Sequence, residues 1–145
     1  MKQRLARIRR LSWHQWGLLG EAGVLLAVAA GAVAFLPFAR VSRWASARRP
    51  GPAQAPDAAQ LRKLRWAVEA VAKRAPFRAK CFERGLAAQW MLGRRRIAST
   101  LFYGAALEEG GGLSAHVWVR AGEFDVVGCE NYSDFTIVAR FPPES

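Results

Sequence analysis

The chain has 145 residues, of which 52% are hydrophobic, and 22 Lys and Arg against 11 Asp and Glu give a formal net charge of +11. This length allows one small globular domain, and the charge favours an anionic partner such as an acidic peptide or a membrane surface. The basic residues gather at the edges of apolar segments, without the exposed aromatics or groove-reading motifs of nucleic-acid-binding proteins, so nucleic acid is excluded as a general partner.

The N-terminal part is basic and then apolar. Ser12 is a candidate N-cap for a first helix. Residues 22–38 carry no charge, and Pro37 ends the run. Such a run fits a helix that is packed or lies on a membrane surface, a membrane span, or a cleaved signal peptide. We expect a cytoplasmic protein in which any membrane association is made through residues 17–38.

A linker follows, because three prolines and a glycine lie between residues 50 and 56. It divides an N-terminal helical segment, residues 1–49, from a second unit, residues 57–145. Asp57 is a candidate N-cap of the next helix. That helix has one apolar face formed by residues at helical spacing: Leu61, Leu64, Val68 and Val71.

Another helix is expected from Cys81 to about Gly93. Pro76 and a short extended run precede it, which places Cys81 at or near its N-terminus. There the free backbone N–H groups favour an anion and Lys80 adds a positive charge, so Cys81 is a candidate nucleophile. A buried thiol that only fills space is the alternative.

Beyond Ile97 the hydrophobic pattern alternates, which is typical of strands. Helices followed by an antiparallel sheet predict an α+β domain. A glycine-rich loop is expected at residues 108–112 and a turn around Gly122. The expected strands are residues 99–105, 115–121, 124–127 and 134–141.

His116 lies on the second expected strand, 35 residues after Cys81. A thiol and an imidazole are the nucleophile and the base of thiol-based acyl transfer. A half-buried structural histidine is the alternative. Cys81 and the second cysteine, Cys129, have neither the spacing of zinc ligands nor the pattern of a disulfide framework. We therefore expect a reducing compartment, and we expect no metal and no other cofactor.

Two blocks of sequence, residues 76–97 and residues 112–119, resemble the leader peptidases of lasso-peptide biosynthesis. These form the peptidase half of the lasso B protein and belong to the transglutaminase-like cysteine protease superfamily, with the microcin maturation protease as a relative. The resemblance covers residues 58–141. It implies a transglutaminase-like, papain-like core in which N-terminal helices pack on a small antiparallel sheet. It also implies a catalytic pair, Cys81 as nucleophile and His116 as base.

The third catalytic residue is where the chain departs from this family. Many members carry an Asp twelve residues after the histidine, and this chain has Gly128 there. If Gly128 opposes His116 across a hairpin, Glu130 shares the face of the histidine and is the expected orienting residue, whereas Asp125 points the other way. A register shifted by one residue would turn Asp125 to that face, but still about 13 Å from His116. The remaining alternatives are a backbone carbonyl that holds the tautomer and a Cys81–His116 dyad without a third residue.

The resemblance implies removal of the leader from a ribosomally synthesised lasso-peptide precursor. The implied partners are the precursor, a separate small leader-recognition protein and an asparagine-synthetase-like cyclase. Two other functions stay open. One is a transglutaminase-like acyl transferase that uses an amine acceptor. The other is a non-catalytic assembly protein that associates with a membrane.

Overall fold

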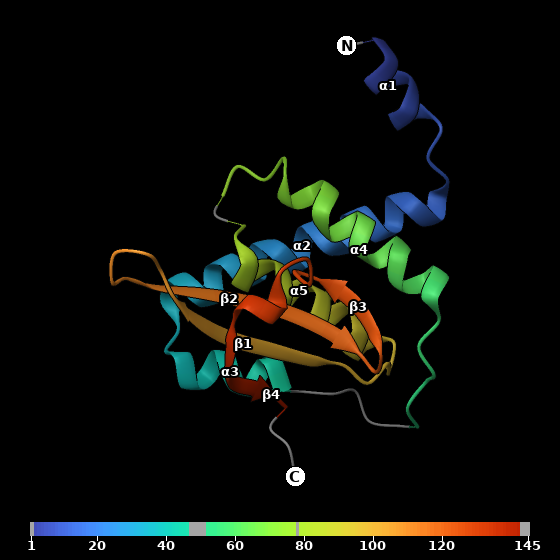
Figure 1. Ribbon diagram of the computed structural model, residues 1–145. Helices are drawn as coiled ribbons and strands as arrows, with labels where there is room; N and C mark the ends of the chain where they lie inside the picture. Colours follow the sequence, from blue (N-terminus) through green and yellow to red (C-terminus); the bar gives the residue numbers. More distant parts are fainter. Residues whose placement is uncertain (1, 47–51, 78, 143–145) are drawn as a thin grey trace.

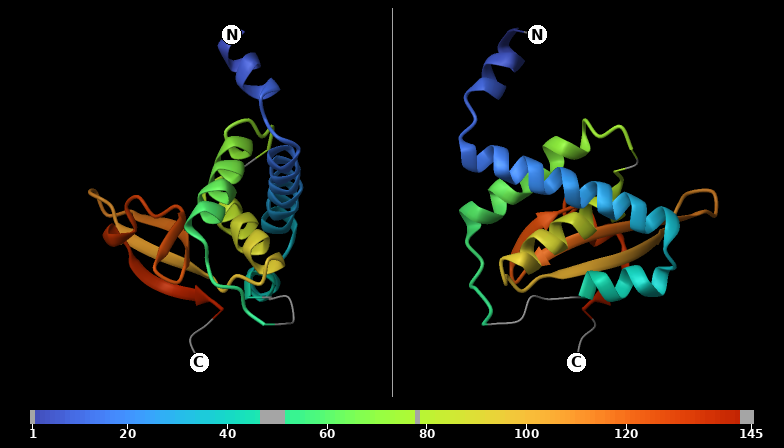
Figure 2. Two further views of the ribbon diagram at one scale, coloured as in Figure 1. Left: turned by 90° about the vertical axis from the view of Figure 1, so that its right-hand side faces the viewer. Right: turned by 180° about the vertical axis from the view of Figure 1, so that it is seen from behind.

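A computed structural model describes residues 2–46, 52–77 and 79–142. It is an α+β fold, as expected: a sheet, two helices packed on one of its faces, and α2 as the outermost layer beyond them (Figures 1 and 2). The helices of the described residues are α1 (Lys2–Arg9), α2 (Trp13–Phe35), α3 (Phe38–Ser46), α4 (Ala58–Ala72), α5 (Cys81–Arg94) and the short 3-10 helix η1 (Tyr132–Asp134); the strands are β1 (Thr100–Leu107), β2 (Leu113–Ala121), β3 (Phe124–Val127) and β4 (Thr136–Phe141).

The expected strands are confirmed, with changed ends. All pairings are antiparallel, and the strand order is β3-β2-β1-β4. The β1–β2 ladder continues up to the pair Leu107 and Leu113, directly at the glycine-rich loop. The last strand begins at Thr136 rather than at residue 134, because η1 occupies the residues before it.

Two predicted helix caps are confirmed. The Ser12 hydroxyl accepts a hydrogen bond from the backbone N–H of Gln15, and the Gln15 side chain accepts one from the Ser12 N–H, which forms a capping box. The Asp57 carboxylate accepts from the Ala59 N–H at 3.1 Å. The apolar face of α4 is also as expected, with Leu61, Leu64 and Val68 buried.

Helix α5 packs directly against the sheet at Gly85. A Cβ atom on this residue would lie 2.7 Å from Val117 Cγ1 and 3.3 Å from Leu101 Cδ1. The missing side chain therefore lets α5 approach β1 and β2 closely. Leu86 and Met91, buried on the same helix, continue the hydrophobic core on either side of this contact.

Helix α2 contributes to the same core. Ala22, Leu26 and Ala29 are fully buried, and α2 packs on α4 and α5. Glu21 on α2 accepts hydrogen bonds from both terminal nitrogens of Arg95 at the end of α5, at 2.8 and 2.7 Å. Of the expected linker, residues 50 and 51 lie outside the described residues, and Gln54 forms a parallel bridge with Ile97.

A buried amide joins three elements at the far end of α5. Gln89 Nε2 donates to the carbonyl oxygens of Ala45 at 3.0 Å and Phe141 at 2.9 Å. Ser99 Oγ donates to Gln89 Oε1 at 2.7 Å. Because buried polar groups need partners, this amide fixes the ends of α3 and β4 and the entry to β1 relative to α5.

The chain crosses the outer face of the sheet between its last two strands. Strand β3 lies at one edge and β4 at the other, so the intervening segment has to pass over β2 and β1 (Figure 1). It brings the Tyr132 ring onto Trp118, with ring centroids 5.7 Å apart. Trp118 is therefore buried beneath this segment.

Candidate active site

Cys81 is the first residue of α5, where the sequence predicted it. The residue before it, Lys80, is the extended N-cap and makes no side-chain capping hydrogen bond. The first N–H groups of a helix have no intrahelical acceptor. At the start of α5 these groups lie beside the half-buried thiol of Cys81. Such groups stabilise an anion, on sulfur or on a reacting carbonyl oxygen.

Arg84 fixes the position of the segment that precedes Cys81. Its Nε donates to the carbonyl oxygen of Ala79 at 2.9 Å, and its Nη1 donates to Glu69 on α4 at 3.0 Å. The guanidinium therefore ties the segment just before Cys81 both to the first turn of α5 and to α4. The position of the thiol depends on this link as well as on the packing of α5.

His116 lies on β2 and projects from the face of the sheet opposite to α5. Its neighbour Val117 faces α5, since Val117 contacts Gly85 of that helix. Side chains alternate along a strand, so His116 points to the outer face. Its ring lies 6.0 Å from the ring of Trp118 and 5.0 Å from that of Phe135, between centroids. The crossing segment that carries Phe135 thus half-covers the imidazole.

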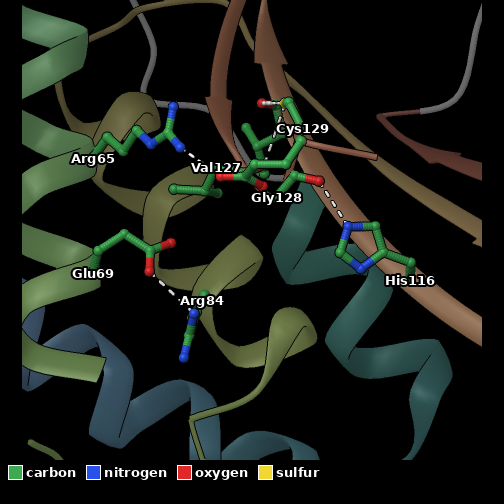
Figure 3. Close-up of polar contacts among 9 residues, drawn as sticks. Arg65, Glu69, Arg84, His116, Val127, Gly128 and Cys129 are labelled. Atoms are coloured by element: carbon green, nitrogen blue, oxygen red, sulfur yellow. Dashed lines mark hydrogen bonds and ion pairs between the residues drawn. The ribbon is translucent and has the colours of Figure 1, made fainter. Parts of the chain in front are cut away.

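One polar contact orients the ring. His116 Nε2 lies 2.7 Å from the carbonyl oxygen of Gly128 (Figure 3). A carbonyl oxygen only accepts hydrogen bonds, so Nε2 carries the hydrogen and donates it. In the neutral ring this leaves the lone pair on Nδ1, which has no hydrogen-bond partner within the described residues. His116 is therefore set up with Nδ1 as its basic atom.

Gly128 can make this contact because it has no side chain. Its φ is 73°, in the left-handed region that favours glycine. A Cβ atom there would lie 2.5 Å from the carbonyl oxygen of Val117 and 3.2 Å from Trp118 Cα. An Asp, which many of the resembled peptidases carry at this position, does not fit this backbone. The carbonyl oxygen reaches the imidazole instead.

The register of the β2–β3 hairpin differs from the expected one. Val119 pairs with Val127, but Arg120 pairs with Asp125, so Val126 is an extra residue in the ladder. Such a bulge shifts the strand pairing by one residue between its two sides. A continuous ladder with His116 opposite Gly128 would pair Arg120 with Phe124. The expected opposition is wrong because the turn pairs Ala121 with Phe124 and the bulge then adds one more residue.

The shifted register turns Asp125 to the outer face, as the alternative pairing predicts. Asp125 Oδ1 accepts from Arg120 Nε at 2.8 Å. Since its strand partner lies four residues from His116 along β2, Asp125 does not reach the imidazole.

Glu130 does not contact His116. Its carboxylate pairs with Arg65 on α4, and 64% of its side chain is exposed. The prediction that Glu130 orients the imidazole is therefore corrected: the bulge and the left-handed Gly128 turn the chain toward α4, and the carbonyl of Gly128 makes the orienting contact.

The two predicted catalytic residues lie near the same end of the sheet, but on opposite faces of it. The Phe82 ring, next to Cys81, lies 6.5 Å from the Tyr103 ring, and Tyr103 pairs with Val117, next to His116. Within the described residues no hydrogen bond joins Cys81 Sγ to the imidazole. Catalytic hydrogen bonds are often long in the absence of substrate and tighten in its complex.

The surroundings of Cys129 are those of a structural thiol. Its Sγ lies 3.3 Å from the carbonyl oxygen of Val119 and 3.4 Å from that of Val127. Burial, and then the charge of Asp125, raise the pKa of this thiol to about 11. It therefore stays protonated near neutral pH and is a poor nucleophile. Nowhere among the described residues do three or more His, Cys, Asp or Glu side chains gather closely enough to hold a metal ion.

No curated protein and no solved structure matches this chain. A family model described as the transglutaminase-like superfamily matches residues 24–140, from within α2 to within β4. The match includes the Cys81 helix and the His116 strand. The superfamily includes cysteine proteases and acyl transferases. The chain belongs to the transglutaminase-like superfamily.

Proposed function

We propose that this protein is a cysteine peptidase that removes the leader from a ribosomally synthesised precursor of the lasso type. The observation that carries the proposal is the contact between His116 Nε2 and the Gly128 carbonyl oxygen, at 2.7 Å, which leaves Nδ1 as a base at the same end of the fold as Cys81. Superfamily membership supports thiol chemistry. The two resembling blocks, residues 76–97 and 112–119, support the choice of substrate.

His116 projects from the face of the sheet opposite to α5, so the proposed reaction requires the imidazole and the Cys81 thiol to come together when substrate binds. When substrate binds and the two groups close to hydrogen-bonding distance, His116 Nδ1 takes the Cys81 proton, and the sulfur attacks the scissile carbonyl carbon. The backbone N–H of Cys81 donates to the resulting oxyanion. Collapse breaks the C–N bond, and the imidazolium returns the proton to the leaving amine. Water then hydrolyses the thioester, which frees the leader and regenerates the thiol.

The Gly128 carbonyl supports both proton transfers. It accepts from Nε2–H in the neutral ring and in the imidazolium, so it keeps one tautomer and stabilises the charged ring. A carbonyl dipole does this more weakly than a carboxylate. The enzyme then works as a Cys81–His116 dyad with a backbone orienting group.

The proposed setting is the cytoplasm, with a separate leader-recognition protein that presents the precursor and an asparagine-synthetase-like cyclase that uses the freed N-terminus. The purified chain alone should cleave precursor slowly, and the recognition protein should raise the rate. Full activity without any partner would contradict this part of the proposal.

The test is cleavage of a precursor in the presence of the leader-recognition protein, followed by mass spectrometry. Cys81→Ala and His116→Ala should each abolish release of the leader. Cys129→Ala is the matched control, and it should retain activity because its thiol lies elsewhere. Unchanged cleavage by Cys81→Ala would exclude thiol catalysis. A cross-linked product in place of a free leader would indicate acyl transfer to an amine.

A further inference from the structure

Helix α2 has two apolar sides, and only one of them is covered. Ala22, Leu26 and Ala29 face α4 and α5 and are fully buried. The opposite side faces solvent, as the outermost layer of the molecule in Figure 2. Large hydrophobic side chains are exposed along this outer face from one end of the helix to the other: Trp13, Trp16, Val24, Val28 and Phe35.

The outer face of α2 is long and uncharged. The helix has 23 residues, so it extends about 35 Å at 1.5 Å per residue. The smaller exposed residues between the large ones are mainly Gly17, Gly20 and Ala27. The one charged residue of the helix, Glu21, forms ion pairs with Arg94 and Arg95 at the C-terminal end of α5. An apolar face of this length is unusual on a soluble domain and marks a binding surface.

Helix α2 is long and apolar enough, by length and composition, to cross a membrane. Its contacts argue against a span. To cross a bilayer, α2 would have to leave the core that buries Ala22 and Leu26, and Glu21 would lose Arg95 and enter hydrocarbon. A carboxylate at the centre of a bilayer is costly. A helix that lies in the membrane surface keeps its inner contacts and still removes its outer face from water.

The segments on either side of α2 supply the charge that such a surface favours. Residues 1–46 contain seven Lys and Arg and a single acidic residue, the paired Glu21. Helix α1 combines these basic residues with the exposed side chains of Leu5 and Ile8. Helix α3 adds Arg40 and Arg43. Basic residues next to apolar ones favour an anionic bilayer over a neutral one.

We propose that the outer face of α2, together with the basic helix α1, binds the surface of an anionic lipid bilayer. The two tryptophans at the start of α2, Trp13 and Trp16, would lie at the level of the lipid headgroups. The sheet is on the other side of the molecule from α2, so the His116 side of the sheet stays in water (Figure 2). Neither the binding nor its test depends on the Cys81 chemistry.

The experiment is flotation of the full chain with vesicles of phosphatidylcholine, alone or with added phosphatidylglycerol. The wild-type protein should float with the anionic vesicles, less so with neutral ones, and less so at high salt because salt screens the charges. Val24→Glu should lower the vesicle-bound fraction about tenfold, since it places a charge in the membrane-facing surface. Val138→Glu on β4 is the matched control: Val24 and Val138 are each 63% exposed. Circular dichroism of both variants checks that they fold.

A nitroxide label at position 24 separates a surface helix from a span. It is attached through Val24→Cys in a chain that also carries Cys81→Ala and Cys129→Ala. Val24 is near the middle of α2, so a surface helix holds the label within about 10 Å of the headgroups, and a span puts it at the bilayer centre. Absence of flotation, equal loss in both glutamate variants, or a label at the bilayer centre would overturn the proposal. So would a stable dimer that Val24→Glu dissociates, because a second copy would then cover this face.

Discussion

The carbonyl oxygen of Gly128 accepts a 2.7 Å hydrogen bond from His116 Nε2, at the position where many of the resembled peptidases carry an aspartate. The same backbone conformation that brings the oxygen to the ring leaves no room for a side chain, since a Cβ atom would lie 2.5 Å from Val117 O. The group that orients His116 in this chain is therefore a backbone carbonyl. The tautomer of the proposed base depends on a glycine.

Gly128→Ala should therefore lower kcat about a hundredfold, because the added Cβ displaces the carbonyl from the imidazole. In the wild-type protein, ¹⁵N NMR should show His116 with its hydrogen on Nε2, and the variant should show a mixture of tautomers. Gly122→Ala is the matched control: its φ of 61° is similarly left-handed, but nothing lies within 4 Å of the added Cβ. An unchanged tautomer with lost activity would assign Gly128 to folding instead.

Glu130→Ala should leave the cleavage rate within about twofold of wild type, because its carboxylate pairs with Arg65 and not with His116. Its effect on the free energy of unfolding should be below about 1 kcal/mol, since both partners of this ion pair are largely exposed. Steady-state cleavage and urea denaturation measure the two quantities. A loss of kcat as large as that of Gly128→Ala would restore Glu130 as the orienting residue.

Glu21 should make the fold sensitive to acid. Burial raises the pKa of this carboxyl, but the hydrogen bond and charge of Arg95, with the charge of Arg94, outweigh burial and lower the pKa below its usual value of 4.5. The ionised pair therefore stabilises the fold above about pH 4.5 and is lost as the pH falls through the lowered value. Glu21→Gln should cost about 2 kcal/mol of unfolding free energy at pH 7.

The difference between wild type and Glu21→Gln should shrink as the pH is lowered to about 3, because protonation removes the same charge. Urea titrations across this range measure it. Glu109→Gln, in the exposed loop after β1, serves as control and should change little at any pH. A constant difference at all pH values would assign the effect to packing.

Gln89→Leu should lower the free energy of unfolding by about 2 to 4 kcal/mol. The substitution removes the donors to Ala45 O and Phe141 O and leaves the buried Ser99 hydroxyl without its acceptor. Denaturant unfolding measures the loss. Gln60→Leu, on the exposed side of α4, is the control for the change of side chain, and a similar loss there would contradict the role of the buried amide.

The two thiols should differ in alkylation. With a pKa of about 11, about one Cys129 side chain in a thousand is ionised at pH 8. Iodoacetamide should therefore modify Cys81 first, and Cys129 should react only after unfolding. Peptide mass mapping over time follows both sites, with Cys81→Ala to isolate the slower one. Equal rates in the folded protein would contradict the placement of Cys129.

The sequence predicts the frame of this site well, because local signals determine it. Pro76 and the helical pattern after it place Cys81 at the start of α5, and alternation places His116 on β2. The helix caps at Ser12 and Asp57 follow from the same kind of local pattern. These features need no knowledge of distant contacts.

The orienting contact could not be predicted in this way. Apolar residues occupy both faces near the end of β3, so alternation reveals neither the tight turn that pairs Ala121 with Phe124 nor the extra residue Val126. The predicted register is therefore shifted, and Glu130 is wrongly expected next to His116 instead of Arg65. Gly128 itself was the available signal, since a glycine in place of an acid suggests close backbone approach. Its carbonyl direction depends on the packing of Val117 and Trp118, which only the fold specifies.

We propose that Cys81 is the nucleophile of a leader peptidase. A synthetic leader that ends in a chloromethyl ketone, added with the leader-recognition protein, tests this role by peptide mass mapping. The predicted result is one leader adduct on Cys81 in the wild-type protein, formed much more slowly by His116→Ala. An adduct on Cys129, or no adduct while precursor is still cleaved, would contradict the claim.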